Sequence, residues 1–173
     1  MNKPQGIIVF GANGSGKSTL GRELARFLKY KYMDIEDYYF EESDIPYTKS
    51  RSREDCLILM LADTQRYGSL IISAVTGNLG EEISSKYDLA IHITTPLEIR
   101  MKRIEQREYE RFGVRFCKGG DMYKGQQKFH DFVASRSLDF IDAWANTLVC
   151  PVLTVDGTKP IAELIKQIGE HIK

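Results

Sequence analysis

Eight residues near the start of the chain have the types and the spacing that phosphate binding requires. Gly11 to Ser18 read G-A-N-G-S-G-K-S, which matches the pattern G-x-x-x-x-G-K-[ST]. The glycines allow the backbone to curl around phosphate oxygens, so that consecutive N–H groups point at the anion. In this pattern the lysine reaches the outer phosphates and the last hydroxyl binds Mg²⁺. We therefore expect a nucleotide-binding loop, with Ser18 as Mg²⁺ ligand, formed by Gly11, Ala12, Asn13, Gly14, Ser15, Gly16, Lys17, Ser18 and Thr19.

The elements on either side of this loop are the ones that the motif requires. Residues 6–10 form an apolar run, which is typical of a parallel strand buried on both faces. Apolar residues at helical spacing follow the loop, at Leu20, Leu24, Phe27 and Leu28. The expected order is strand, loop and helix, so phosphate would lie at the positive end of the helix dipole.

Strand-like runs recur along the chain, separated by helical patterns. They cover residues 6–10, 32–35, 70–74, 89–93 and 152–155. Such alternation predicts parallel βαβ units and an α/β fold.

Composition limits the protein class. A chain of 173 residues suits one domain, 1–173, and its 24 basic and 24 acidic residues balance. This balance argues against nucleic acid or an anionic membrane as partner. Three widely spaced cysteines favour neither a disulfide framework nor a zinc site, and no apolar stretch suggests a signal or a membrane span. We expect a cytoplasmic protein, a monomer or a homodimer.

Two segments break the βα pattern. A polar stretch within residues 38–52 indicates a mobile insertion, which we place at about 36–66. Four glycines within residues 112–125 indicate a loop able to move, and we place this second segment, a lid, at about 108–130. A helix is expected to follow from Gln126 to Trp144.

The remaining motifs select among proteins with a phosphate loop. The segment 72–80 holds no D-x-x-G, and the sequence holds no N-K-x-D, so a GTPase is disfavoured. The chain leaves little room for the extra helical domain of a remodelling ATPase. A helix beginning near Pro96 instead carries two arginines, Arg103 and Arg107, directly before the glycine-bearing segment.

On these features the chain resembles the nucleoside and nucleotide kinase group of P-loop proteins, which has the fold of adenylate and shikimate kinases. The resemblance covers essentially the whole chain. It implies a three-layer α/β P-loop NTPase fold, with a five-stranded parallel sheet in the order 2-3-1-4-5 and helices on both faces. The insertion would bind the phosphate acceptor, and the lid would close over the site.

The resemblance also assigns roles to arginines. In the family pattern R-x-x-x-R, the first arginine packs on adenine and the second meets the transferred phosphate; here these are Arg103 and Arg107. Lid arginines of the family close over the γ-phosphate, and Arg111, Arg115 and Arg136 are the matching positions. The family turn G-T-x-P, which cradles adenine, matches Gly157, Thr158 and Pro160.

An acidic cluster after the second strand is similar to the D-x-D of shikimate kinases. Here it reads D-x-E-D, from Asp34 to Asp37, which leaves the base open between those two aspartates. Asp34 could instead hold Mg²⁺ through water, and either aspartate could cap the helix that follows.

The expected activity is ATP- and Mg²⁺-dependent phosphorylation of a small molecule. A nucleoside or nucleotide is the preferred acceptor, with a shikimate-like metabolite as the alternative. A phosphate acceptor would need no base, and Arg51 and Arg53 would then be its ligands. Two further alternatives are an ATP-binding regulator with little turnover and a polynucleotide kinase.

Overall fold

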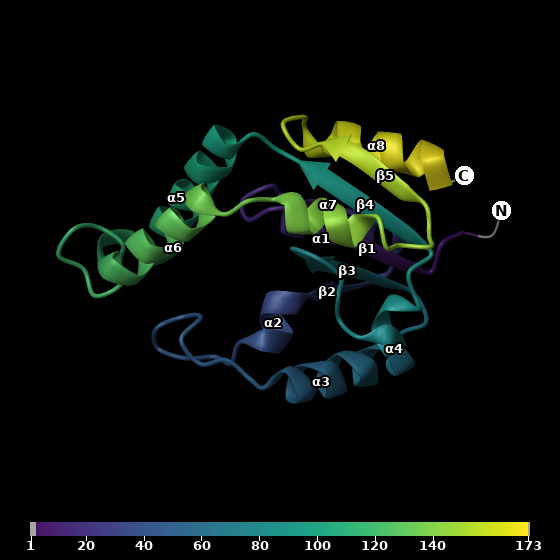
Figure 1. Ribbon diagram of the computed structural model, residues 1–173, viewed down its shortest axis with the longest axis horizontal. Coiled ribbons are helices and arrows are strands. Elements are labelled where there is room, and N and C mark those ends of the chain that lie inside the picture. Colours follow the sequence, from purple (N-terminus) through teal and green to yellow (C-terminus); the bar gives the residue numbers. More distant parts are fainter. Residues whose placement is uncertain (1–2, 173) are drawn as a thin grey trace.

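The centre of the protein is an all-parallel sheet in the strand order β2-β3-β1-β4-β5 (Figure 1). The computed structural model describes residues 3–172. The strands are β1 Gly6–Phe10, β2 Lys31–Asp34, β3 Leu70–Ala74, β4 Leu89–Thr94 and β5 Val152–Asp156. Every neighbouring pair is parallel. The expected fold class and strand order are therefore confirmed.

The central strand β1 is buried along its whole length, because helices cover both faces of the sheet. Ile7 and Val9 of β1 face α1 (Lys17–Leu28) and α8 (Ile161–Ile172). The alternate residues Ile8 and Phe10 face the opposite layer. This two-sided burial is why the strand reads as a continuous apolar run.

The opposite layer is formed by three helices: α3 (Arg53–Arg66), α4 (Glu81–Ser84) and α7 (Asp139–Ala145). Met60 of α3 and Ile141 of α7 are almost fully buried in its core. The first residues of α3 are held by Ser52, whose hydroxyl accepts a hydrogen bond from the backbone N–H of Asp55 at 3.0 Å.

The remaining elements project beyond the carboxyl ends of the strands. They are α2 (Ile35–Tyr39), α5 (Leu97–Phe112), the short 3₁₀ helix η1 (Gly113–Arg115) and α6 (Tyr123–Ser135). Figure 1 shows α5 and α6 side by side at one end of the molecule, with the loop after α2 at the same end. Ligands of parallel α/β sheets bind beyond the carboxyl ends of the strands, so these elements surround the expected site.

The single helix expected from Gln126 to Trp144 is wrong, because the chain forms two helices there. Arg136 ends α6 with an extended backbone, at φ −71° and ψ 123°. The Ser137 hydroxyl then accepts a hydrogen bond from the N–H of Asp139, which starts α7, at 3.2 Å. The break allows α7 to pack on the sheet while α6 packs on α5.

Replacing Leu20, which is fully buried between α1 and the sheet, by alanine should lower the free energy of unfolding by about 2–5 kcal/mol. The loss combines reduced apolar burial with the cavity left behind. Urea unfolding followed by circular dichroism would measure it. The matched control is Leu59→Ala on α3, whose side chain is 43% exposed and should cost far less. Equal losses would contradict the assigned core.

Candidate functional site

The phosphate loop lies between β1 and α1 and has the backbone geometry of an anion site. Gly14 and Gly16 have φ values of 78° and 101°, a region that favours glycine. A Cβ on Gly14 would also lie 2.6 Å from the carbonyl oxygen of Arg100. Gly16 caps α1 without any side-chain hydrogen bond, which leaves the first-turn N–H groups of the helix available to a bound anion.

Lys17 and Ser18 lie at the start of α1, in a polar cavity of about 440 Å³ that we call the phosphate cavity. Its walls include the residues from Gly14 to Thr19, together with acidic and basic side chains from other elements. Lys17 is buried, and this burial lowers the pKa of its ammonium group, while the negative charges of Glu36 and Asp34 oppose the shift. The cavity therefore combines a lysine with uncapped helix amides.

The three acidic residues of the D-x-E-D cluster, Asp34, Glu36 and Asp37, all line the phosphate cavity. Asp34 is buried, and its two oxygens accept hydrogen bonds from the Tyr32 hydroxyl at 2.9 Å and the Glu36 N–H at 3.2 Å. It is thus the N-cap of α2 as well as a wall of the phosphate cavity. Asp37 lies in that wall too; desolvation and then the charge of Asp34 raise the pKa of its carboxyl group.

Glu36 is the acidic residue that the sequence reasoning missed as a candidate base. It lines the phosphate cavity and also a second cavity beside it. The sequence did carry a signal for Glu36. In the D-x-D pattern the second acidic residue stands two positions after the first, and in D-x-E-D that position is Glu36, not Asp37.

Two arginines of α5 hold the phosphate loop in place. Arg103 donates to the carbonyl oxygen of Ser15 at 3.1 Å and to that of Gly157 at 2.8 Å. Arg100 is buried and donates to the carbonyl oxygens of Asn13 at 3.2 Å and Thr95 at 3.1 Å. Arg100 was not among the expected site residues. The available signal was its spacing, because residues three positions apart on a helix lie on the same face, and Arg100 is three positions before Arg103.

The turn after β5 meets the loop through Gly157. Its carbonyl accepts from Arg103, and a Cβ at this position would lie 2.8 Å from the carbonyl oxygen of Ser15. Gly157 lines the phosphate cavity, whereas the Thr158 hydroxyl donates to Asp156 at 2.8 Å. Pro160 lies at the start of α8, where its carbonyl accepts from the helix. Of the expected adenine turn, Gly157 is thus the residue nearest the phosphate loop.

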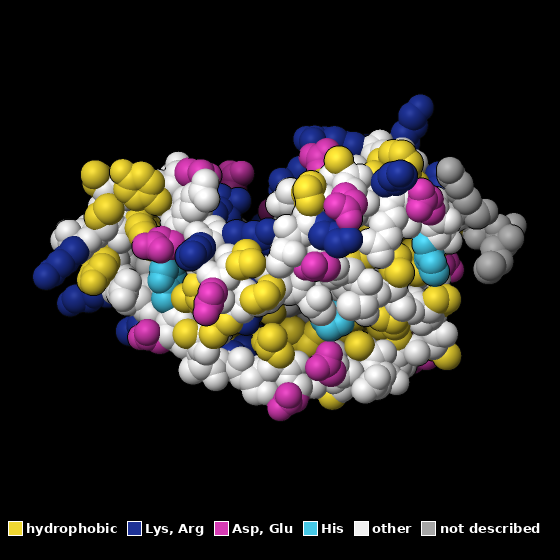
Figure 2. Space-filling model, turned by 90° about the horizontal axis from the view of Figure 1, so that it is seen from above, with side chains coloured by type: hydrophobic (Ala, Val, Ile, Leu, Met, Phe, Trp, Pro, Cys, Tyr) yellow, Lys and Arg dark blue, Asp and Glu magenta, His cyan; other side chains and the backbone are white. Residues whose placement is uncertain are grey.

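The four expected phosphate arginines separate into two groups. Arg107 and Arg111 of α5 line the phosphate cavity. Arg115 pairs with Asp121 at 2.8 Å and does not line the cavity. Arg136 also lies outside its walls, because its guanidinium stacks on Phe140 at 3.9 Å from the ring centroid. Figure 2 shows Lys and Arg side chains gathered along the hollow between the two parts of the surface.

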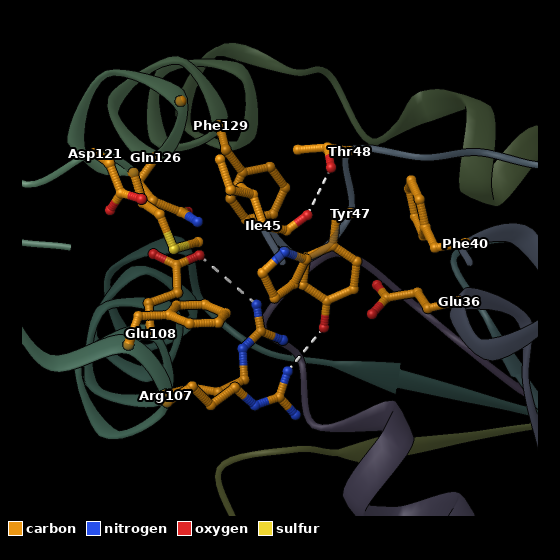
Figure 3. Close-up of a pocket in the computed structure, with 15 residues that line it drawn as sticks. Glu36, Phe40, Ile45, Tyr47, Thr48, Arg107, Glu108, Asp121, Gln126 and Phe129 are labelled. Atoms are coloured by element: carbon orange, nitrogen blue, oxygen red, sulfur yellow. Dashed lines mark hydrogen bonds and ion pairs between the residues drawn. The ribbon is translucent and has the colours of Figure 1, made fainter. Parts of the chain in front are cut away.

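The second cavity, of about 520 Å³, lies between the segment after β2 and the helices α5 and α6 (Figure 3). We call it the outer cavity. Its residues come from the expected insertion, Glu36 to Thr48, from Arg107, and from the expected lid, Glu108 to Phe129. Four residues line both cavities and so form a shared wall: Glu36, Tyr47, Arg107 and Arg111. Across this wall, Arg111 donates to the Tyr47 hydroxyl at 2.8 Å.

The two arginines suggested for an acceptor phosphate are engaged elsewhere. Arg51 donates to the carbonyl oxygens of Tyr38 and Phe40, both at 2.9 Å, and so holds the turn after α2. Arg53 begins α3 and approaches the carbonyl oxygen of Asn78 at 3.4 Å. Neither lines either cavity.

Within residues 3–172, no group of three or more His, Cys, Asp or Glu side chains could hold a metal ion. The chemistry at the phosphate loop still suits Mg²⁺, because the Ser18 hydroxyl and the Asp34 carboxylate line one cavity and Mg²⁺ is commonly bound together with substrate phosphates. In the same described part of the chain, no helix has both the length and the apolar character that crossing a membrane would require.

Comparison with known proteins adds three relationships to this geometry. The family model AAA_18, described as an AAA domain, matches residues 7–122. The protein YqaC of Bacillus subtilis (strain 168) is 27% identical over 176 residues, which are 96% of each chain. A shikimate kinase of Clostridium botulinum (strain ATCC 19397 / Type A) is 30% identical over 117 residues, 61% of this chain and 68% of that one.

A solved structure shares the fold. The shikimate kinase from Acinetobacter baumannii in complex with shikimate superposes with a TM-score of 0.57, over 99% of this chain and 93% of that one, at 17% identity. The fold assigned from the sheet order is therefore that of P-loop kinases.

Replacing Arg100 by lysine should loosen the phosphate loop, because an ammonium group cannot reproduce the forked contacts to the carbonyls of Asn13 and Thr95. We expect a loss of about 1–3 kcal/mol in unfolding free energy and faster hydrogen–deuterium exchange in residues 11–16. The control is Arg26→Lys, since exposed Arg26 pairs only with Glu23 on the surface of α1. Unchanged exchange in the loop would disprove this role of Arg100.

Proposed function

Because this chain belongs to the AAA-domain family and has the fold of P-loop kinases, we propose that it transfers the γ-phosphoryl group of ATP to a hydroxyl group of a small molecule. Its relationship to shikimate kinase places it among the small-molecule kinases. One observation carries the proposal: the phosphate cavity and the outer cavity share a wall that bears both carboxylate and guanidinium groups. An acceptor in one cavity would thus face a phosphoryl group in the other.

The phosphate loop would bind the nucleotide. Helix amides and Lys17 would hold the phosphate oxygens, and Arg103 fixes the loop against the turn at Gly157. When bound, Mg²⁺ would neutralise charge on the phosphates; Ser18 would ligate it directly and Asp34 through water. Phosphoryl transfer depends mainly on such positioning and charge neutralisation.

The shared wall would position the acceptor. Arg107 and Arg111 can offer forked donors to the oxygens of the transferred group. Glu36 faces both cavities and is the best-placed carboxylate to take the proton of an acceptor hydroxyl. Asp34 is less suited to that task, because it caps α2 and lines the phosphate cavity but not the outer cavity.

A hydroxyl acceptor is better supported than a phosphate acceptor. Arg51 is used by the backbone of the insertion, and Arg53 lies outside the outer cavity. A carboxylate at the junction of the two cavities assists a hydroxyl, which must lose a proton, and would repel a phosphate. Among the acceptors that the sequence suggested, nucleosides and shikimate-like compounds thus remain ahead of nucleotides.

Lys17→Ala should reduce phosphoryl transfer by about 10²-fold or more, because a preorganised charge at the transferring group is lost. A coupled ADP-release assay with ATP, Mg²⁺ and a panel of nucleosides, shikimate and gluconate would measure it. Lys166→Ala, on the exposed face of α8, is the matched control and should retain full activity. If no acceptor in the panel stimulates ADP release by the unmodified protein, the proposed function is wrong.

Glu36→Gln should lower kcat by about 10²–10⁴-fold, the range typical of a lost general base, while the KM for ATP changes little. The same assay measures both constants. Glu42→Gln, in the exposed loop after α2, tests whether any charge change in the insertion has this effect. If Glu36→Gln keeps the kcat of the unmodified protein and Asp34→Asn or Asp37→Asn does not, the base is one of the aspartates.

A further inference from the structure

The outer cavity has the composition of a site for a planar apolar group. Its volume of about 520 Å³ lies within the range of about 300–1,000 Å³ that is typical of small-molecule sites. Aromatic and other apolar side chains make up much of its wall: Phe40, Pro46, Tyr47, Phe112, Met122 and Phe129. Phe40 and Tyr47 already pack edge to face, with ring centroids 5.2 Å apart. Such walls favour an aromatic ring over a polyol.

The charges around this cavity disfavour an anionic acceptor. Three carboxylates line it, from Glu36, Glu108 and Asp121. Its two arginines, Arg107 and Arg111, belong to the wall shared with the phosphate cavity, where the transferred phosphoryl group needs them. No lysine is found among its lining residues. Asp121 is already paired with Arg115, and Glu108 lies 2.9 Å from His130. A carboxylate or phosphate on the acceptor would therefore find no cation among the lining residues apart from the two arginines of the shared wall.

Polar side chains line the end of the cavity that lies opposite Glu36. Figure 3 shows Glu108 and Gln126 on one side of the cavity, with Glu36 and Phe40 on the other. Glu108 is 3% exposed, and its carboxylate lies 2.9 Å from Nε2 of His130. In the amide orientation that satisfies its hydrogen bonds, Gln126 donates to the same carboxylate at 2.9 Å and 3.2 Å. This leaves the Gln126 carbonyl oxygen as an acceptor group at the cavity.

We propose that the outer cavity binds the planar ring of a neutral, nucleoside-like acceptor, with the ring held by the aromatic wall and its edge read by Glu108 and Gln126. The inference rests on the proposed function, and it names the acceptor class of that same site. Carboxylate and amide oxygens accept hydrogen bonds, so the ring should present amino or imino N–H groups. The hydroxyl at the other end of the molecule then points to Glu36 and the phosphate cavity.

The acceptor class can be tested by substrate preference. The panel is adenosine, guanosine, cytidine and thymidine, their 5′-monophosphates, shikimate and gluconate, each with ATP and Mg²⁺, with ADP release measured and the product identified by mass. We expect at least one nucleoside to raise ADP release about 10-fold or more over ATP alone, with its monophosphate at least about 10-fold poorer in kcat/KM. Turnover with shikimate, gluconate or a monophosphate in preference to every nucleoside overturns this inference and leaves the proposed kinase activity standing. Turnover with none of them overturns both.

The ring-reading role of Glu108 needs its own variant, because the same side chain also joins α5 to α6. Glu108→Gln should raise the KM for the nucleoside about 10-fold and change the preferred base, with the KM for ATP nearly unchanged. A purely structural role would instead lower stability and leave base preference as it is. Glu105→Gln, on the exposed face of α5, is the matched control.

A second variant keeps the test valid if Glu108→Gln does not fold. Phe129→Ala removes part of the aromatic wall and should raise the KM for the nucleoside about 10-fold, while Phe27→Ala, 57% exposed on α1, should not. An unchanged KM for the nucleoside in Phe129→Ala would overturn the placement of the ring.

Discussion

The functional region depends on the attachment of the phosphate loop to α5. A loop rich in glycine exposes its carbonyls, and it has few side chains with which to hold itself. Arg100 and Arg103 supply this support by donating to the carbonyls of Asn13 and Ser15. The Thr95 hydroxyl donates to the carbonyl of Ser15 as well, at 3.0 Å. These donors hold the carbonyl groups of the loop toward α5, and the amide groups of the loop are left free to face a bound anion.

Helix α5 also supplies side chains to both cavities. Arg103 contacts the loop and the turn after β5, Arg107 and Arg111 line both cavities, and Glu108 contacts α6 through His130. The three arginines recur at four-residue intervals, so they share one side of α5, and Glu108 is adjacent to Arg107. One helix thus connects the phosphate loop, the two cavities and α6.

Local patterns predicted the fold and the phosphate loop, while long-range contacts decided the rest. The strands could be predicted because a strand that is buried on both faces consists of consecutive apolar residues, as residues 6–10 do. Arg136 looked like a lid arginine, but the aromatic ring of Phe140 binds its guanidinium. Glu36 was passed over in favour of Asp37, although it stands two positions after Asp34; its place in the wall of two cavities is visible only in the folded chain. Arg111 and Tyr47, 64 residues apart, meet only in the folded chain.

The contact between Arg111 and Tyr47 involves a residue with a strained backbone conformation. Tyr47 has a φ of 64°, a left-handed conformation that is uncommon for a bulky side chain and costs about 1–3 kcal/mol. Such a conformation persists only where surrounding contacts determine it. Here the Tyr47 ring packs on Phe40 and its hydroxyl accepts from Arg111. The strained turn therefore places one side chain in the wall of both cavities, where it separates the polar space around the phosphate loop from the apolar space beside it.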